Sequence, residues 1–160
     1  MFVFENFLDK DTCEYYKEIV ASNYKLKCEQ GYDPLDFQES RNVVLENDPI
    51  LPKVINFLES KIRVKLSCTQ CELQTWPINE GSSLHVHNFN GRENTDYNSL
   101  IYLNDDFGNG EFYTSTGITL KPSQGRLTFF NGQETCHGVN PATGKHRYTI
   151  IFWWNNTQFY

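Results

Sequence analysis

The stretch after Leu66 constrains the fold most, because the hydrophobic pattern changes there from a helical period to a strand period. From that point on, short runs rich in alternating, β-branched and aromatic residues are separated by Gly, Asn, Asp and Pro. The predicted strands cover 72–76, 83–89, 97–104, 111–113, 117–121, 126–130 and 146–154. Seven or eight short strands at this spacing predict a sandwich or jelly roll.

The residues before this β half predict helices that support it. Phe2–Phe4 reads as a short edge strand, and a helix with a single apolar stripe is expected from Asp9 or Asp11 to about Ser22. A second helix with an apolar stripe is expected over about 48–64. The expected fold class is therefore mainly β with N-terminal helices, an α+β arrangement in which the helices pack on one outer face of the β half.

The segment 23–41 between the two helices predicts a long loop. It is polar, contains Gly31 and Pro34, and keeps no sustained hydrophobic period. The loop can include a little strand, and a loop of this length could cover a site.

Composition and charge limit the class of protein. A chain of 160 residues with 39% hydrophobic content suits one core, so we assign 1–160 to a single domain, with helical support over 1–66 and a β core over 67–160. The net charge of −6 and the absence of long basic clusters argue against a nucleic-acid partner. The apolar runs are too short to span a membrane, and the N-terminus lacks the regions of a secretory signal, so we expect a cytoplasmic protein.

The cysteines predict neither a disulfide framework nor a metal site. There are five of them, an odd number, and Cys68-Thr-Gln-Cys71 is a C-x-x-C pattern with no second pair. It opens a strand-like run, whereas a redox pair gains its low thiol pKa at a helix N-terminus. Ordinary half-buried thiols are the favoured interpretation.

Three histidines form the candidate metal site. His85 and His87 lie two positions apart in a strand-like run, which predicts that both side chains leave the same face of a sheet. His137 follows the apolar run 127–130 and precedes the final strand. Three imidazoles could converge on one ion and leave coordination positions open for substrates. The alternative is that these histidines lie on the surface or in the core and bind no metal.

Six sequence blocks of the β half carry a family resemblance. They are His85-Val-His-Asn-Phe-Asn-Gly, Ser99-Leu-Ile-Tyr-Leu-Asn-Asp-Asp, Gly110-Glu, Leu120-Lys-Pro-Ser-Gln-Gly-Arg-Leu-Thr-Phe-Phe, Cys136-His-Gly-Val-Asn-Pro and His146-Arg-Tyr-Thr-Ile-Ile-Phe-Trp. In order and spacing they resemble the prolyl 4-hydroxylase-like branch of the 2-oxoglutarate- and Fe(II)-dependent dioxygenases, over about 72–155. The resemblance implies a double-stranded β-helix, the cupin-like jelly roll that the strand pattern predicts independently.

The family's iron ligands are a His-x-Asp pair and a distal histidine. The resemblance implies that His85 is the first ligand, that His137 is the last, and that His87 takes the place of the carboxylate. Three neutral imidazoles leave an iron site at formal charge +2 in place of +1, although bound 2-oxoglutarate would bring two negative charges. A three-histidine iron site is thus chemically possible, and an inactive relative or a site for another divalent metal is the alternative.

The resemblance also implies the residues that hold the cosubstrate. Arg147 is where the family places the basic residue that pairs with the distal carboxylate of 2-oxoglutarate, and Thr149 points to the same face of the strand. Tyr102 resembles the tyrosine that hydrogen-bonds this carboxylate, with a core aromatic as the competing interpretation. Trp76 occupies a position where some relatives place another cosubstrate-binding tyrosine.

Two functions follow from the resemblance. The first is an enzyme that uses Fe(II), 2-oxoglutarate and dioxygen to hydroxylate a C–H bond, with a prolyl residue of a peptide or protein as one candidate substrate and a small molecule as another. The second is a catalytically silent or other-metal relative that acts as a binding module. In either case we expect recognition by the loops 23–41 and 88–98.

Overall fold

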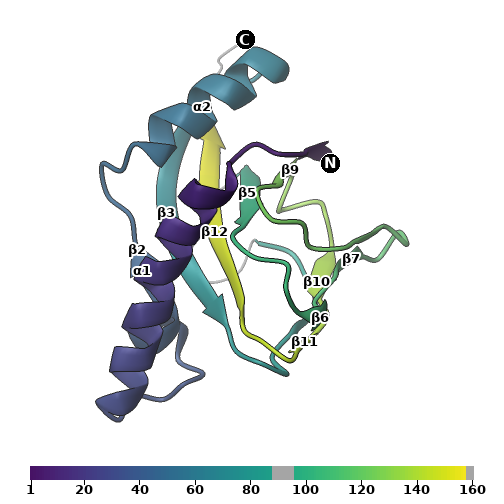
Figure 1. The fold of residues 1–160 in the computed structure, drawn as a ribbon. Helices are drawn as coiled ribbons and strands as arrows, with labels where there is room; N and C mark the ends of the chain where they lie inside the picture. The colour runs from purple at the N-terminus through teal and green to yellow at the C-terminus, as the bar shows by residue number, and fades with distance from the viewer. Residues whose placement is uncertain (88–95, 158–160) are drawn as a thin grey trace.

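Two antiparallel β-sheets face each other, and two helices cover the outer face of the larger one (Figure 1). The computed structural model describes residues 1–87 and 96–157 of the chain. In spatial order, the larger sheet consists of β1 (Phe2–Phe4), β9 (Leu127–Phe130), β5 (Tyr97–Tyr102), β12 (Arg147–Asn156), β3 (Leu66–Trp76) and β2 (Asn42–Val44). The smaller sheet consists of β4 (Ser82–His85), β10 (His137–Val139), β7 (Phe112–Thr114) and β8 (Thr119–Leu120). A two-stranded sheet joins β6 (Gly108–Asn109) to β11 (Ala142–Thr143). The predicted mainly β jelly roll is confirmed.

Helix α1 (Lys10–Glu29) begins where the sequence predicts and ends later. Asp9 caps it, because its carboxylate accepts the Thr12 N–H at 2.7 Å. The predicted end near Ser22 was wrong. Lys25, Leu26 and Lys27 are good helix formers, and the helix stops only before Gly31, whose φ of +89° suits the residue that follows a helix.

The segment 23–41 is therefore not one long loop. Its first part belongs to α1, and its last part forms a short π-helix, η1 (Phe37–Arg41), which leads directly into β2. The Asp36 carboxylate accepts the N–H groups of the two residues that open this turn, Gln38 and Glu39. Arg41 is buried at its end.

Helix α2 (Ile50–Lys61) matches the second predicted helix. Its stripe of Ile50, Val54 and Leu58 is buried together with residues of α1 and of the larger sheet. Burying a side chain of this size contributes about 1.5–3 kcal/mol. The helical layer thus anchors the outer face of the sheet that carries the candidate cosubstrate residues.

The strand predictions hold for the long strands and fail at short ones. β3 starts at Leu66 and not at 72, because its polar first half is specified by pairing with β12. The short strands β6, β10 and β11 were not predicted. The predicted strand 83–89 ends at His85, and its last two residues lie outside the described part of the chain.

The two faces of the larger sheet differ in chemistry. The outer face presents Ile150, Phe152 and their apolar neighbours to the helices. The inner face carries buried polar side chains, among them Arg147, Thr149 and Tyr102. The smaller sheet covers part of this inner face: Phe130 of β9 lies against Phe112 of β7 with ring centroids 5.3 Å apart. The polar groups are thus enclosed between the sheets, where each needs a partner.

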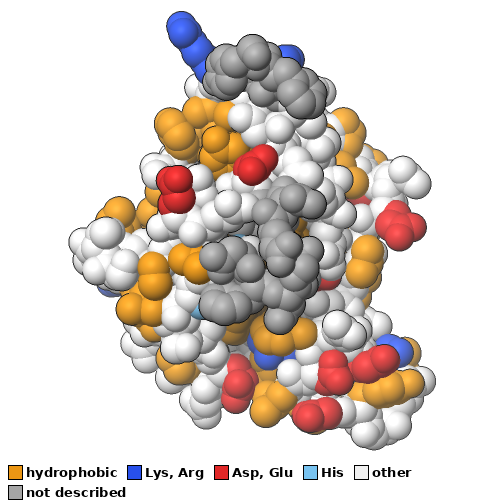
Figure 2. Space-filling view, turned by 180° about the vertical axis from the view of Figure 1, so that it is seen from behind, with side chains coloured by type: hydrophobic (Ala, Val, Ile, Leu, Met, Phe, Trp, Pro, Cys, Tyr) orange, Lys and Arg blue, Asp and Glu red, His pale blue; other side chains and the backbone are white. Residues whose placement is uncertain are grey.

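Acidic side chains are scattered, and not clustered, over one face of the molecule. Figure 2 shows them on the face opposite to that of Figure 1, with few basic side chains between them. Within residues 1–87 and 96–157, no helix combines the length and apolar character needed to cross a membrane.

Candidate active site

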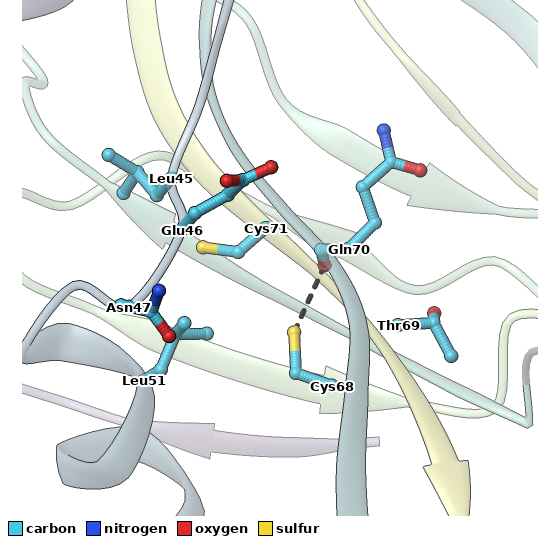
Figure 3. Close-up of a pocket in the computed structure, with 8 residues that line it drawn as sticks. All are labelled: Leu45, Glu46, Asn47, Leu51, Cys68, Thr69, Gln70 and Cys71. Carbon is cyan, nitrogen blue, oxygen red and sulfur yellow. Dashed lines mark hydrogen bonds between the residues drawn. The ribbon is translucent and has the colours of Figure 1, made fainter.

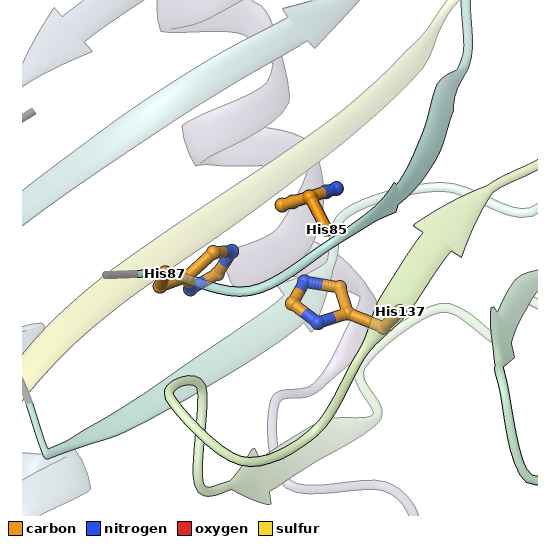
Figure 4. A group of neighbouring side chains, drawn as sticks. All are labelled: His85, His87 and His137. Atoms are coloured by element: carbon orange, nitrogen blue, oxygen red, sulfur yellow. The ribbon is translucent and has the colours of Figure 1, made fainter. Parts of the chain in front are cut away.

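Three histidine rings meet between the two sheets (Figure 4). His85 of β4 and His137 of β10 are directly opposite each other in the antiparallel pairing, so their side chains leave the same face. Their ring centroids are 4.5 Å apart. The sequence prediction that these two residues converge agrees with this geometry.

His87 reaches the group by a different route from the predicted one. It lies beyond the end of β4, so the argument from strand alternation does not apply to it. Its backbone N–H donates to the Gly132 carbonyl at 2.8 Å, which turns the chain back toward the site. The His87 ring centroid is 4.5 Å from that of His137 and 5.2 Å from that of His85.

The three rings lie close to the spacing that one ion needs. Their candidate ligand nitrogens all lie within 4.8 Å of one another, and two nitrogens that bind one metal at roughly 2.0–2.3 Å each are at most about 4.6 Å apart. Metal coordination by His85, His87 and His137 remains a prediction that this geometry supports.

Hydrogen bonds set the tautomer of each ring. Nδ1 of His85 lies 2.8 Å from the Ser83 carbonyl oxygen, and Nδ1 of His137 lies 2.7 Å from the Thr135 carbonyl oxygen. A carbonyl oxygen can only accept, so Nδ1 carries the proton and Nε2 carries the lone pair. This arrangement of a buried or half-buried histidine is the one found at metal sites, where the second nitrogen is held by an acceptor.

His137 is held neutral by its surroundings. Its side chain is 4% exposed and stacks on Phe112 with ring centroids 5.1 Å apart. Burial lowers the pKa of His137 to about 4. A neutral imidazole is the form that binds a metal, so the ring is ready to coordinate at physiological pH.

The inner face of the larger sheet offers a candidate anion site. Arg147 is 1% exposed, and Tyr102 and Thr149 are fully buried. Among the described residues, Nη1 of Arg147, the Tyr102 hydroxyl and Oγ1 of Thr149 form no hydrogen bond of good geometry, although the guanidinium and the Tyr102 hydroxyl lie near enough for each to shift the pKa of the other. No carboxylate forms an ion pair with the guanidinium in the described part of the chain. Burial lowers the pKa of Arg147 to about 10, so the group stays charged at neutral pH. A buried cation beside two unpaired hydroxyls suits a carboxylate, and these residues therefore fit 2-oxoglutarate.

Trp76 packs against the guanidinium of Arg147. Arg147 Cζ lies 4.7 Å from the centroid of the Trp76 ring, and the indole N–H donates to Gln74 Oε1 at 3.3 Å. The single donor of the indole thus has a protein partner. The predicted role of Trp76 as a cosubstrate-binding residue stays a prediction, and its observed contact is with the guanidinium.

Two residues at the site were missed by sequence reasoning. Asn98 of β5 lies four residues before Tyr102 on the same inner face, and period-two counting back from Tyr102 would have found it. Arg41 contacts the other side of the aromatic cluster, with Cζ 3.5 Å from the Phe37 ring centroid and 4.9 Å from that of Trp76. No sequence signal marked Arg41, because its segment was predicted to be a loop.

The remaining candidates lie apart from this site. The Nδ1 of His146 accepts the N–H of Ile78 at 3.0 Å, and His146 does not belong to the three-histidine group. Cys68 and Cys71 line a separate pocket with Leu45, Leu51 and their neighbours (Figure 3). Burial raises the pKa of the Cys68 thiol to about 11 and that of Cys71 further, so both are thiols and not thiolates, in line with the interpretation from sequence.

Comparison with known protein sequences gives one family and one group of relatives. Residues 72–155 match the model of the 2OG-Fe(II) oxygenase superfamily. Prolyl 3-hydroxylase 2 from Mus musculus is 35% identical over 72 residues, which cover 41% of this chain and 10% of the relative. Prolyl 3-hydroxylase 1 from Homo sapiens is 35% identical over 65 residues, 36% of this chain and 9% of the relative. The chain thus spans about a tenth of the length of these curated relatives.

Solved structures share the fold over nearly the whole chain. The 2OG complex of a viral collagen prolyl hydroxylase from Paramecium Bursaria Chlorella virus-1 gives a TM-score of 0.71 at 15% identity, covering 98% of this chain and 96% of that one. A prolyl-4-hydroxylase from Pseudomonas putida gives 0.66 at 16% identity, covering 98% and 92%. A prolyl hydroxylase from Trichoplax adhaerens, in complex with a peptide fragment of the hypoxia inducible factor oxygen degradation domain, gives 0.63 at 20% identity, covering 97% and 83%. At these identities the likeness shows the double-stranded β-helix fold.

Proposed function

Because the chain belongs to the 2OG-Fe(II) oxygenase superfamily, we propose that it is a prolyl hydroxylase-like dioxygenase that hydroxylates a C–H bond of a peptide or protein. The observation that carries the proposal is the presence of two incomplete sites, one at the histidine group and one on the inner face of the larger sheet. One is a set of three imidazoles with ligand nitrogens within 4.8 Å of one another. The other is a buried arginine flanked by two unpaired hydroxyls. Iron and a dicarboxylate are the pair of ligands that would complete both.

Each residue has a defined role in this proposal. His85, His87 and His137 hold Fe(II) through Nε2. Arg147 grips the distal carboxylate of 2-oxoglutarate, and Tyr102 and Thr149 donate hydroxyl hydrogen bonds to it. Trp76 holds the guanidinium by stacking. When bound, Fe(II) and 2-oxoglutarate supply the chemistry, in which dioxygen is reduced, 2-oxoglutarate is decarboxylated to succinate and the substrate C–H bond is hydroxylated.

The packing between the two sheets also favours cosubstrate binding, because it keeps water away from part of the site. Phe112 and Phe130 pack against His137 and exclude water from one side of the histidine group. In such a low-dielectric space the attraction between the guanidinium and a carboxylate is stronger than in water. The residues of this chain would thus bind and orient the dicarboxylate before any substrate is oxidised.

A prolyl residue of a peptide is the substrate class that the relatives favour. The sequence relatives are prolyl 3-hydroxylases, and one solved neighbour is a prolyl hydroxylase in complex with a peptide fragment. Proline-containing peptides should therefore gain one oxygen atom when incubated with the iron-loaded protein, 2-oxoglutarate and air. Mass spectrometry with fragmentation would identify the residue that carries the oxygen atom. If only a free small molecule were oxidised, the proposal of a peptide substrate would be wrong.

A second function is favoured by one specific observation, the three-histidine ligand set. Without a carboxylate, the site carries one more positive charge than the family pattern and can prefer zinc, nickel or copper. The chain would then be a catalytically silent or other-metal relative that acts as a binding module. Its fold and its anion site would be the same, so the chemistry has to be measured.

One experiment separates the two functions. The protein is loaded anaerobically with Fe(II) and 2-oxoglutarate, the weak visible absorption of the chelate is recorded, and succinate is measured after air is admitted. We expect a visible band and succinate release, with the Arg147→Ala variant as the control that lacks the cosubstrate anchor. A visible band without succinate release would favour the silent binding module. The absence of both the band and succinate would contradict the enzyme proposal.

A further inference from the structure

Asn98 connects the histidine group to the larger sheet. Its side chain is fully buried on β5, and Oδ1 lies 2.7 Å from Nδ1 of His87. Its Nδ2 donates to the backbone carbonyl of Phe152 on the neighbouring strand β12, at 3.3 Å. Because a carbonyl oxygen can only accept, this second bond fixes which end of the amide faces the histidine. The amide oxygen must point at His87.

This orientation selects the tautomer of His87. The amide oxygen accepts from Nδ1–H, so Nε2 is the nitrogen that carries the lone pair. His85 and His137 obtain the same tautomer from carbonyls two residues earlier in their own segments. His87 differs, because it lies outside β4 and its acceptor is a side chain from the opposite sheet.

Gly132 completes the support of His87. Its carbonyl accepts the His87 backbone N–H at 2.8 Å. A Cβ atom on Gly132 would lie 1.9 Å from Asn98 Oδ1 and 2.9 Å from His87 Nδ1, closer than atoms can approach. The hydrogen bond between Asn98 and His87 therefore passes through space that only a glycine leaves open.

We propose that Asn98, in the space left by Gly132, is the positioning residue that makes His87 a metal ligand. The inference rests on the proposed three-histidine metal site and extends it. An acceptor on Nδ1 raises the basicity of the ligating nitrogen and holds the ring in place, which are the two properties that a histidine needs where the family has a carboxylate. On this view the His-x-His pair is a built ligand set with its own support, and not a carboxylate site that has lost its metal.

Metal affinity in matched variants tests the proposal. Asn98→Leu removes the acceptor at similar volume, and Asn98→Asp keeps it. With Co(II) as a spectroscopic probe and Fe(II) added anaerobically, we expect Asn98→Leu to bind about 10- to 100-fold more weakly than the parent and Asn98→Asp to stay within about threefold. Nitrogen chemical shifts of the histidine rings should show that Asn98→Leu, and not Asn98→Asp, loses the single Nε2-lone-pair tautomer at His87.

A double-mutant cycle and a control distinguish positioning from general stability. In the His87→Asp background, which keeps a metal ligand but has no imidazole, Asn98→Leu should cause no further loss of Co(II) affinity, because Asn98 acts through the His87 ring. Thr128→Val is the control: it removes a buried hydroxyl that donates to Leu100 O at 3.4 Å in the same sheet and makes no hydrogen bond to His87, so it should leave Co(II) affinity unchanged. Melting temperatures recorded for all variants show that each is folded at the assay temperature.

Three outcomes would overturn the proposal. If the parent binds Co(II), His87→Ala does not, and Asn98→Leu binds as the parent does, then this inference is wrong and the metal site stands. If Thr128→Val loses as much affinity as Asn98→Leu, the role of Asn98 is structural. If the parent binds neither Co(II) nor Fe(II), the proposed function fails together with the inference.

Discussion

Tyr102 and Thr149 lie directly opposite each other in the pairing of β5 with β12, and both are fully buried. Neither hydroxyl has a hydrogen-bond partner among the described residues. A buried polar group left unpaired costs about 1–3 kcal/mol, so two on facing positions beside Arg147 are unfavourable for a protein without a ligand. The two hydroxyls therefore support the proposal that an oxygen-rich anion binds beside Arg147.

The first prediction concerns these hydroxyls. Tyr102→Phe and Thr149→Val each remove an unsatisfied group, so the melting temperature of the ligand-free protein should stay the same or rise. Each variant should bind 2-oxoglutarate about tenfold more weakly, since a hydrogen bond to a charged group contributes about 1.5 kcal/mol. Calorimetric titration into metal-loaded protein measures the affinity. A lower melting temperature with unchanged affinity would mean that both residues only fill the core.

The second prediction separates cosubstrate from metal at Arg147. Arg147→Ala should leave metal affinity nearly intact and weaken 2-oxoglutarate binding by about 2–4 kcal/mol, roughly 30- to 1,000-fold. Arg147→Lys should lose less 2-oxoglutarate affinity, because it keeps the positive charge but not the two parallel N–H donors of the guanidinium. Arg147→Met should match the alanine variant in affinity while it stabilises the ligand-free protein, because it removes an unpaired buried charge. Titration of 2-oxoglutarate decides, and parent-like affinity in the alanine variant would make Arg147 structural.

The sequence predicts those parts of the site that depend on local spacing. Arg147 and Thr149 share a face because they are two apart in a strand, and period two is visible in a single sequence. That Thr149 faces Tyr102 depends on the register between β12 and β5, which is set by pairing over long separations and by packing on the helices. Family resemblance, and not spacing, brought Tyr102 into the predicted site.

Other features escaped prediction for different reasons. Strands β6, β10 and β11 have two or three residues, too few to show any period. His87 was expected on a strand face and is held instead by a hydrogen bond to Gly132 and by Asn98, both far from it in sequence. The end of α1 is set by Gly31, a stop signal that a hydrophobic pattern does not contain.

The third prediction tests the ligand that departs from the family pattern. His87→Ala should lose metal, whereas His87→Asp should retain iron and turn over at least as fast, because a carboxylate restores the charge of the family site. Metal content after dialysis and succinate release report the two effects. Iron bound equally well by the parent and by both variants would remove His87 from the ligand set.

The fourth prediction uses the space at Gly132. Alanine there would force Asn98 and His87 apart, so Gly132→Ala should lower metal affinity by at least tenfold in addition to destabilising the fold. Gly31→Ala is the matched control, since Gly31 has a φ of +89° and open space around it, and alanine there costs about 1 kcal/mol of backbone strain far from the histidines. Metal affinity and melting temperature are measured for both. If both variants lose melting temperature to the same extent and both bind metal as the parent does, the close approach at Gly132 has no effect on the metal site.

The last prediction concerns acid stability of the metal-free protein. Burial holds the pKa of His137 at about 4, below its ordinary value of 6.5, and the unfolded chain therefore binds a proton in this range that the folded protein does not. Stability from this group is complete above pH 6.5 and falls as the pH is lowered toward 4. At about 1.4 kcal/mol for each pKa unit, the loss is on the order of 3 kcal/mol.

Denaturant unfolding of the parent and of His137→Gln at several pH values isolates the contribution of His137 to the free energy of unfolding, because the carboxylates titrate alike in both proteins. The parent should lose stability more steeply between pH 6.5 and 4, and added Zn(II) should steepen its curve, since protons and metal compete for the same imidazole. Parallel curves for the two proteins would show that His137 is not kept neutral by its burial.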